Sequence, residues 1–253
     1  MMKLILSHSC ADVQKIKDFY QAKRNLRLVE FRASQNLAKH KPAVTMDRFW
    51  RALVCMRLTS RQKSGPDSAV VALVRAQPFP LRLEKLRSNR NSLVKFIASE
   101  LRAVKGMRDY DVAAVQLATN FKMLEGGRWE EFLLMTNGLR GSSSQAAERS
   151  VSNAIQDAFK GFGPKQSRNF LQALGLTRYE IPLDSRVMKW MKSELKFPLP
   201  ISGGVLADAD YYELVLGKVQ ELCKEAKVMP CMLDAAIFAS SDDDTWLPEM
   251  MKF

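Results

Sequence analysis

Residues 160–171 read Lys-Gly-Phe-Gly-Pro-Lys-Gln-Ser-Arg-Asn-Phe-Leu. Before this stretch, a pattern of apolar residues typical of an amphipathic helix ends at Phe159, and a Gly-x-Gly turn follows. Pro164 lies where the first turn of a new helix accepts a proline, because that turn needs no amide donor. The apolar period resumes at Phe170 and Leu171. The stretch therefore predicts two helices joined by a tight hairpin.

This hairpin has the composition of a phosphate-binding turn. Two glycines let the backbone approach a phosphate closely, and the free amides at the start of the second helix point toward such an anion. A turn that only joins two helices is the alternative. The basic side chains around the turn favour phosphate contact. The residues that we expect to contact phosphate are Lys160, Gly161, Gly163, Gln166, Ser167 and Arg168.

Lys165 has an unusual position for a cation. It lies in the first turn of the second helix, where the positive end of the helix dipole disfavours it. One interpretation is a lysine that binds phosphate. The other is a nucleophilic amine whose pKa is lowered by the dipole, by desolvation and by neighbouring cations. Residue chemistry alone favours the first interpretation.

Asp184 follows Lys165 by nineteen residues, in the segment Ile-Pro-Leu-Asp-Ser-Arg at 181–186. The apolar spacing after it predicts another helix, so the carboxylate lies at a helix start. An N-cap aspartate is the simple interpretation of that position. The pair of Lys165 and Asp184 carries more information than either residue alone.

Together, these residues resemble the motif of the helix–hairpin–helix superfamily of base-excision DNA glycosylases. Gly161, Gly163, Lys165 and Asp184 match that motif in order, and the nineteen-residue interval is similar to that of 8-oxoguanine DNA glycosylases. The resemblance covers roughly residues 46–196. It extends to the C-terminal helix at 233–239.

The resemblance implies an enzyme that releases a damaged base from double-stranded DNA, with 8-oxoguanine favoured, and then cuts the strand at the abasic site. Lys165 would attack C1′ of a flipped nucleotide and form a Schiff base that permits β-elimination. Asp184 would stabilise the positive charge on the sugar. Another modified or damaged base is an open alternative. A non-catalytic helix–hairpin–helix DNA-binding protein is a second one.

Other candidate residues come from the same resemblance. Residues 49–62 look like the family's helix and polar wedge, so Arg61 and Gln62 are expected to fill the gap left by the flipped base, although they could equally be a solvated helix end. Trp50 and Phe253 are candidates for the base pocket, although tryptophans at helical spacing usually belong to a core. The chain departs from the family at Lys160, where proline is usual, and in lacking the cysteine quartet of an iron–sulfur cluster.

Composition and charge agree with a nucleic-acid partner. The 253 residues carry a formal net charge of +12, and 47% are hydrophobic, which is typical of a globular protein. Residues 1–206 carry 35 basic and 17 acidic side chains, whereas residues 207–253 carry 4 and 10. A basic body of this kind attracts phosphates, and also membrane surfaces or acidic partners. No run approaches the ~18 apolar residues of a membrane span, and we expect a monomer in the cytoplasm or nucleoid.

Cysteine and histidine spacing predicts neither a metal site nor a cofactor. The four cysteines form no Cys-x-x-Cys pair, and His8 and His40 have no acidic or thiol partner at ligand spacing. Four buried thiols are the simpler interpretation. A catalytic mechanism must therefore use other side chains.

Apolar residues recur at three- and four-residue spacing along the chain, which predicts an all-α fold. We expect a single two-lobed unit over residues 1–253. About 46–140 would form a central lobe, and about 1–45 with 141–253 a second lobe that contains the helix–hairpin–helix at 145–176. The expected helices span 11–38, 46–59, 66–75, 90–103, 109–124, 128–136, 144–159, 164–175, 184–195, 208–227 and 231–239.

Overall fold

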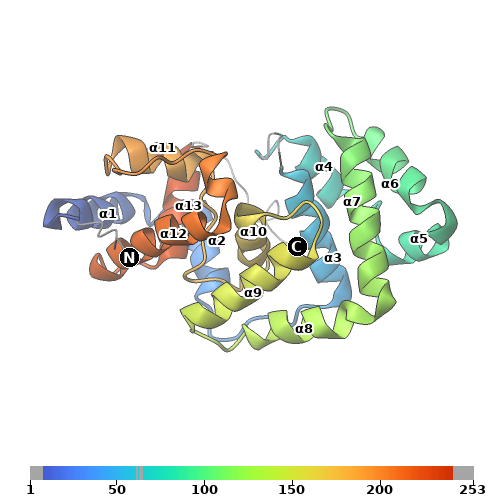
Figure 1. The fold of residues 1–253 in the computed structure, drawn as a ribbon, viewed down its shortest axis with the longest axis horizontal. Helices are drawn as coiled ribbons and strands as arrows, with labels where there is room; N and C mark the ends of the chain where they lie inside the picture. Colours follow the sequence, from blue (N-terminus) through green and yellow to red (C-terminus); the bar gives the residue numbers. More distant parts are fainter. Residues whose placement is uncertain (1–7, 61, 63–64, 242–253) are drawn as a thin grey trace.

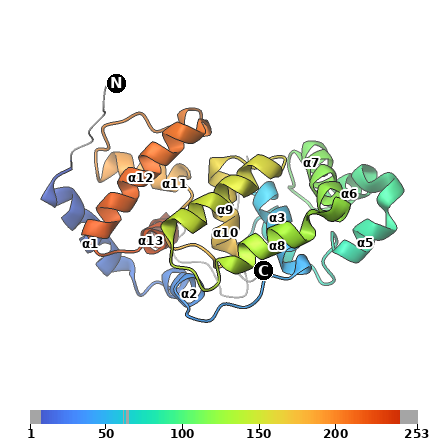
Figure 2. The same ribbon diagram turned by 60° about the horizontal axis from the view of Figure 1, so that its bottom comes forward.

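The structure, a computed structural model, describes residues 8–60, 62 and 65–241. Every regular element in these ranges is a helix, which confirms the all-α prediction. The helices form an elongated body with one group at each end and α9 and α10 in the middle (Figures 1 and 2). Within the same ranges, no helix combines the length and the apolar character needed to span a bilayer.

The helix boundaries mostly lie within a few residues of those expected. Three short elements, the 3-10 helices η1 and η3 and the π-helix η2, complete the set. The α-helices are α1 Cys10–Lys23, α2 Arg27–Asn36, α3 Met46–Leu58, α4 Ala69–Arg75, α5 Leu83–Ser88, α6 Leu93–Arg102, α7 Tyr110–Met123, α8 Trp129–Gly138, α9 Gln145–Ala158, α10 Pro164–Ala173, α11 Ser185–Ser193, α12 Ala209–Glu225 and α13 Pro230–Ser241, with η1 at Arg90–Ser92, η2 at Leu124–Arg128 and η3 at Val205–Ala207.

Two expectations about the helices were wrong. Residues 11–38 form two helices, α1 and α2, because the chain turns at 24–26 and both helices then pack against α13. Helix α5 was not expected. Its six residues are too short to show a helical period in the sequence.

Several helices begin at the polar residues that cap them. Each capping side chain accepts a hydrogen bond from a backbone amide of the first turn, which has no partner inside the helix. These short-range bonds explain why the starts could be placed from the sequence. The capping residues are Ser9, Thr45, Ser68, Ser144, Asp184 and Asp208.

The buried apolar side chains form two core clusters. The first contains residues between 44 and 176, and the second draws on α1, α2, Val71 of α4 and the chain from 181 to 239. Phe49 of α3 contacts both Phe159 and Phe170, with ring centroids 5.9 and 4.8 Å apart. Residues of the hairpin helices α9 and α10 thus pack in the first core.

The hairpin between α9 and α10 is held against α7 and α3. The side chain of Asn120 accepts from the amide of Lys160 at 2.8 Å and donates to its carbonyl at 3.0 Å. Gly161 follows in the left-handed region, with φ of +84°. A Cβ atom there would lie 2.5 Å or less from side-chain atoms of Arg57 and Gln116. Glycine is therefore required at 161 for two separate reasons.

We predict that Gly161→Ala destabilises the protein, whereas Gly163→Ala does not. The first change adds a clash and a left-handed alanine, which together cost about 2 kcal/mol of unfolding free energy. At Gly163 the backbone is extended, with φ of −112°, and an added Cβ meets nothing within 4 Å. Denaturant unfolding of the two variants checks this. Equal stability of both would contradict the packing described here.

Candidate active site

Lys165 is partly buried in the first turn of α10, next to the turn that joins α9 and α10. Burial lowers the pKa of its amine, and the nearby guanidinium of Arg186 lowers it further. The carboxylates of Asp184 and Asp234 act in the opposite direction. Three charged groups, from the N-cap of α11, from α11 and from α13, thus act on one amine.

Asp184 is the N-cap of α11, as the sequence indicated. Its Oδ1 accepts from the amides of Arg186 and Val187 at 2.9 and 3.0 Å. Its Oδ2 lies 3.4 Å from Nη1 of Arg186. The cap occupies one carboxylate oxygen and fixes its direction, while the charge of the group still acts on Lys165. The capping role and an electrostatic role at the lysine therefore coexist in one side chain.

Arg186 ties this loop to α13. Its guanidinium lies over the ring of Phe238, 4.2 Å from the centroid, while Nη1 faces Asp184. A cation held between an aromatic face and a carboxylate has little freedom to move. Arg186 therefore limits how far the Asp184 carboxylate can turn.

Asp234 is a member of the site that sequence reasoning missed. It lies on α13, only 4% exposed, and accepts a hydrogen bond from the side-chain amide of Gln172 on α10. Burial and the charge of Asp184 raise its pKa to about 7, against the opposing effects of Gln172, Arg32 and Arg186. A single charged residue in the apolar run 230–239 is the signal that could have indicated it.

Three residues expected to contact phosphate point into the protein instead. Arg168 is 1% exposed, and its Nε donates to Glu180 at 3.0 Å. Gln166 donates to the carbonyl of Met56 at 2.6 Å, and Ser167 donates to that of Pro164 at 3.0 Å. The amphipathic face of α10 buries these three side chains, so a phosphate contact at these positions would have to come from the backbone and not from the side chains.

The exposed part of the hairpin remains available to an anion. Lys160 and Gly161 are exposed, and Gly163 is half-buried with open space beside its Cα. The first amides of α10 have no partner within the helix, so they can bind an anion. The groups of the hairpin that are open to an anion are therefore backbone amides and Lys160, rather than Arg168.

Of the four residues expected to form the wedge and the base pocket, the structure describes Trp50 and Gln62. Trp50 is 1% exposed, its indole NH donates to the carbonyl of Leu81 at 2.8 Å, and it packs on Phe121, so it belongs to the core and cannot line a pocket. Gln62 accepts from the amide of Arg108 at 3.1 Å. Its own amide also donates to the protein, toward the carbonyl of Leu58 and the sulfur of a methionine. Gln62 therefore connects the end of α3 to residues 107 and 108. Arg61 and Phe253 lie outside the described residues.

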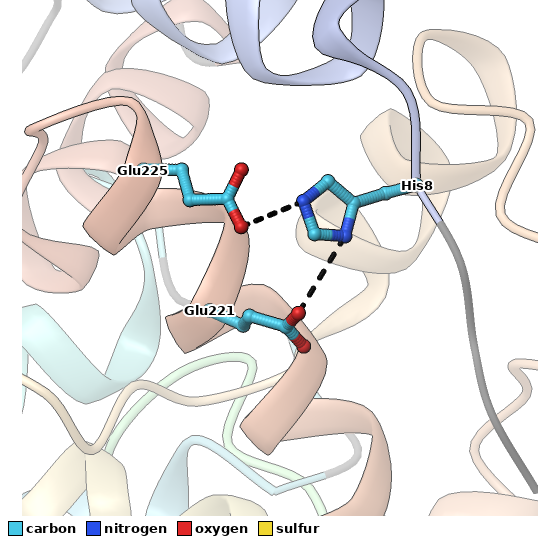
Figure 3. A group of neighbouring side chains, drawn as sticks. All are labelled: His8, Glu221 and Glu225. Carbon is cyan, nitrogen blue, oxygen red and sulfur yellow. Dashed lines mark ion pairs between the residues drawn. The ribbon is translucent and has the colours of Figure 1, made fainter.

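His8 has acidic partners that sequence spacing could not show. It lies between Glu221 and Glu225 of α12, with its Nε2 2.9 Å from a Glu225 oxygen (Figure 3). The ammonium of Lys218 lies 2.7 Å from Nδ1 of the same ring and 3.0 Å from Glu221. Because Lys218 supplies the positive charge, we interpret the group as an ion-pair cluster.

The cysteines are not all buried, contrary to our interpretation of the sequence. Cys55, Cys223 and Cys231 are buried, and burial raises the pKa of each thiol. Cys10 is exposed at the start of α1. The three buried thiols are thus held in the unreactive, protonated form.

We predict that Asp234→Asn changes how stability depends on pH. Because the pKa of Asp234 rises from 3.8 to about 7 on folding, the folded protein holds a proton that the unfolded chain releases between these values. This contribution to stability is complete below about pH 4 and is lost as the pH rises through 7. The asparagine variant has no carboxyl group at this position, so it does not lose stability in this way. The Tm of the variant minus the Tm of the original protein should therefore increase from pH 5 to pH 8. A constant Tm difference across that range would contradict the prediction.

The fold is similar to that of a solved DNA repair enzyme. Neither the comparison with models of protein families nor the comparison with curated protein sequences finds a match. Among solved structures, the chain resembles the 8-oxoguanine DNA glycosylase of Thermotoga maritima, with a TM-score of 0.55 and 18% sequence identity. The match covers 90% of this chain and 93% of that one. It shows that the two proteins share an all-helical fold over nearly their whole lengths.

Proposed function

We propose that this protein is a DNA glycosylase with AP lyase activity, and that Lys165 and Asp184 are its catalytic residues. One observation carries the proposal: a partly buried lysine with a lowered pKa lies in the first turn after the hairpin and is coupled to Asp184. A lysine that served only to bind phosphate would gain nothing from burial or from a carboxylate neighbour. The fold shared with a DNA glycosylase supports the same conclusion.

The amine acts first. The lowered pKa increases the share of Lys165 that is neutral at a given pH, and the Nζ lone pair of the neutral amine can attack C1′ of the sugar. The bond between C1′ and the base nitrogen breaks, and its electron pair leaves with the base, which takes up a proton. Loss of the amine proton and opening of the sugar ring give a Schiff base. Removal of a C2′ proton then expels the 3′ phosphate, which cuts the strand.

Asp184 stabilises the charge that develops on the sugar. As the base departs, positive charge builds up around C1′, and a carboxylate fixed by two backbone amides needs no reorganisation to stabilise it. Asp184 can also carry the proton that the attacking amine loses. The base must leave the helical stack before either group can reach C1′.

The proposed partner is double-stranded DNA that contains a damaged base or an abasic site. Lys160, the two glycines and the first amides of α10 would bind the phosphates of the damaged strand. Among bases we favour 8-oxoguanine, on the strength of the Lys165–Asp184 interval and the similar fold. We further propose that the protein acts as an intracellular monomer.

Trapping with borohydride tests the lyase proposal directly. The protein should form a covalent adduct with an abasic-site duplex, because borohydride reduces a Schiff base to a stable amine. Lys165→Gln should abolish both the adduct and strand cutting while DNA affinity changes only a few-fold, since one of many cations is lost. Lys160→Gln is the matched control: it removes an exposed cation of the same turn and should keep the adduct.

The outcomes separate the alternatives. Strand cutting that persists in Lys165→Gln would overturn the lyase assignment. DNA binding without an adduct from the unaltered protein would favour a non-catalytic DNA-binding function. A panel of duplexes with one damaged base each, read as strand cutting, then identifies the base.

We predict that Asp184→Asn slows base excision by about 100-fold or more, since a charge aimed at the transition state contributes several kcal/mol. Asparagine caps a helix nearly as well as aspartate, so Tm should change little. Asp208→Asn is the matched control, because Asp208 caps α12 in the same way and is not coupled to Lys165. A lower Tm with an unchanged single-turnover rate would mean that Asp184 is only a cap.

A further inference from the structure

The position of Asp184 relative to Lys165 depends on the chain that connects α10 to α11. Residues 176–184 of this connection contain no regular secondary structure, and 181–183 are buried. Buried backbone groups without partners are costly. Thr177 satisfies both backbone groups of Glu180 from within the connection, and groups of other helices satisfy the ones described below. The groups that do so fix the backbone that carries the Asp184 carboxylate.

The hydroxyl of Tyr212 satisfies two of these groups next to Asp184. It accepts a hydrogen bond from the amide of Leu183 at 2.7 Å and donates one to the carbonyl of Ile181 at 3.1 Å. Tyr212 lies on α12, is 0% exposed, and its ring faces the guanidinium of Arg168 at 5.0 Å. One side chain thus bridges the two residues on either side of Pro182.

The phenol is suited to this double role. Burial raises the pKa of Tyr212, so the hydroxyl keeps its proton and can donate and accept at the same time. No water needs to enter the connection at this point. The contact is therefore fixed by two directional bonds in a buried environment.

The earlier part of the connection is held by different groups. Glu148 of α9 accepts from the hydroxyl of Thr177 and from the amides of residues 178, 179 and 180, at 2.8 to 3.1 Å. Glu180 is paired with Arg168 and Arg149. Loss of the Tyr212 hydroxyl would leave this part fixed and would release only the residues that adjoin Asp184.

We propose that Tyr212 is a positioning residue: through the backbone of 181–183 it sets the distance and direction of the Asp184 carboxylate at Lys165. It touches neither DNA nor the reacting atoms. The inference rests on the proposed function for its kinetic consequences. Its structural content, that the hydroxyl holds Asp184 near Lys165, can be measured without any reaction.

The test compares Tyr212→Phe with Tyr211→Phe. Tyr211 is the next residue of the same helix, and its hydroxyl donates to the carbonyl of Pro200 at 2.9 Å, away from the connection. Both changes remove one hydroxyl that donates to a main-chain carbonyl. Only the first removes a hydrogen bond to the segment before Asp184.

The first readout is the pKa of Lys165, followed by NMR of the labelled lysine side chain with assignment from Lys165→Gln. Lys165 is coupled to Asp184, Arg186 and Asp234, and Asp184 raises its pKa. If Asp184 moves away, the pKa of Lys165 should fall toward the value in Asp184→Asn. Tyr211→Phe should leave it unchanged. An unchanged pKa in Tyr212→Phe would overturn the proposal, whether or not the protein acts on DNA.

The second readout is kinetic. At saturating enzyme and well below the Tm of each variant, Tyr212→Phe should slow single-turnover base excision by about tenfold while the Kd for DNA changes less than twofold. In an Asp184→Asn background, Tyr212→Phe should not slow base excision further, because the carboxylate that Tyr212 positions is absent. A further tenfold loss in that background would show a general structural role and overturn the proposal. Failure of the unaltered protein to excise any base would reject the proposed function, and the Lys165 pKa would still decide the role of Tyr212.

Discussion

Arg168 and Glu180 form a buried ion pair that joins α10 to the connection leading to Asp184. Their side chains are 1% and 0% exposed, and Nε lies 3.0 Å from the carboxylate. Removing one partner of such a pair costs about 3–5 kcal/mol, because the other charge is left buried without compensation. Arg168 lies one turn after Lys165, so this ion pair links the lysine helix to the connection that carries the aspartate.

The charges around Lys165 are balanced within the protein. Burial lowers the pKa of Lys165, and the carboxylates of Asp184 and Asp234 act against this effect. The guanidinium groups of Arg32 and Arg186 in turn lower the pKa of Asp234. A buried group in such a network can hold its pKa far from the ordinary value, which is typical of functional sites. Under the proposed function, this network serves an amine that must be neutral to react and a carboxylate that must be charged.

In the hairpin, side chains make the contacts to the rest of the protein, whereas the backbone of the turn stays accessible. The side chains of Gln166, Ser167 and Arg168 turn inward and hold α10 to α3 and to the connection. The part of the hairpin that is open to an anion then consists of the exposed Lys160 and Gly161, the half-buried Gly163 and the first amides of α10. Under the proposed function, this surface would contact the phosphates shared by all DNA sequences, and the lesion would be recognised elsewhere.

Local spacing was sufficient to predict most of the helices, the hairpin and the positions of Lys165 and Asp184 at helix starts. Caps, glycine turns and helical periods depend on residues only a few positions apart. The inward direction of Arg168, the core position of Trp50, and the contributions of Asp234 and Tyr212 could not be predicted in this way. Their partners lie 12 to 62 residues away along the chain, as between Gln172 and Asp234. A buried polar side chain takes its role from the group that satisfies it, and only packing of distant helices brings that group into contact.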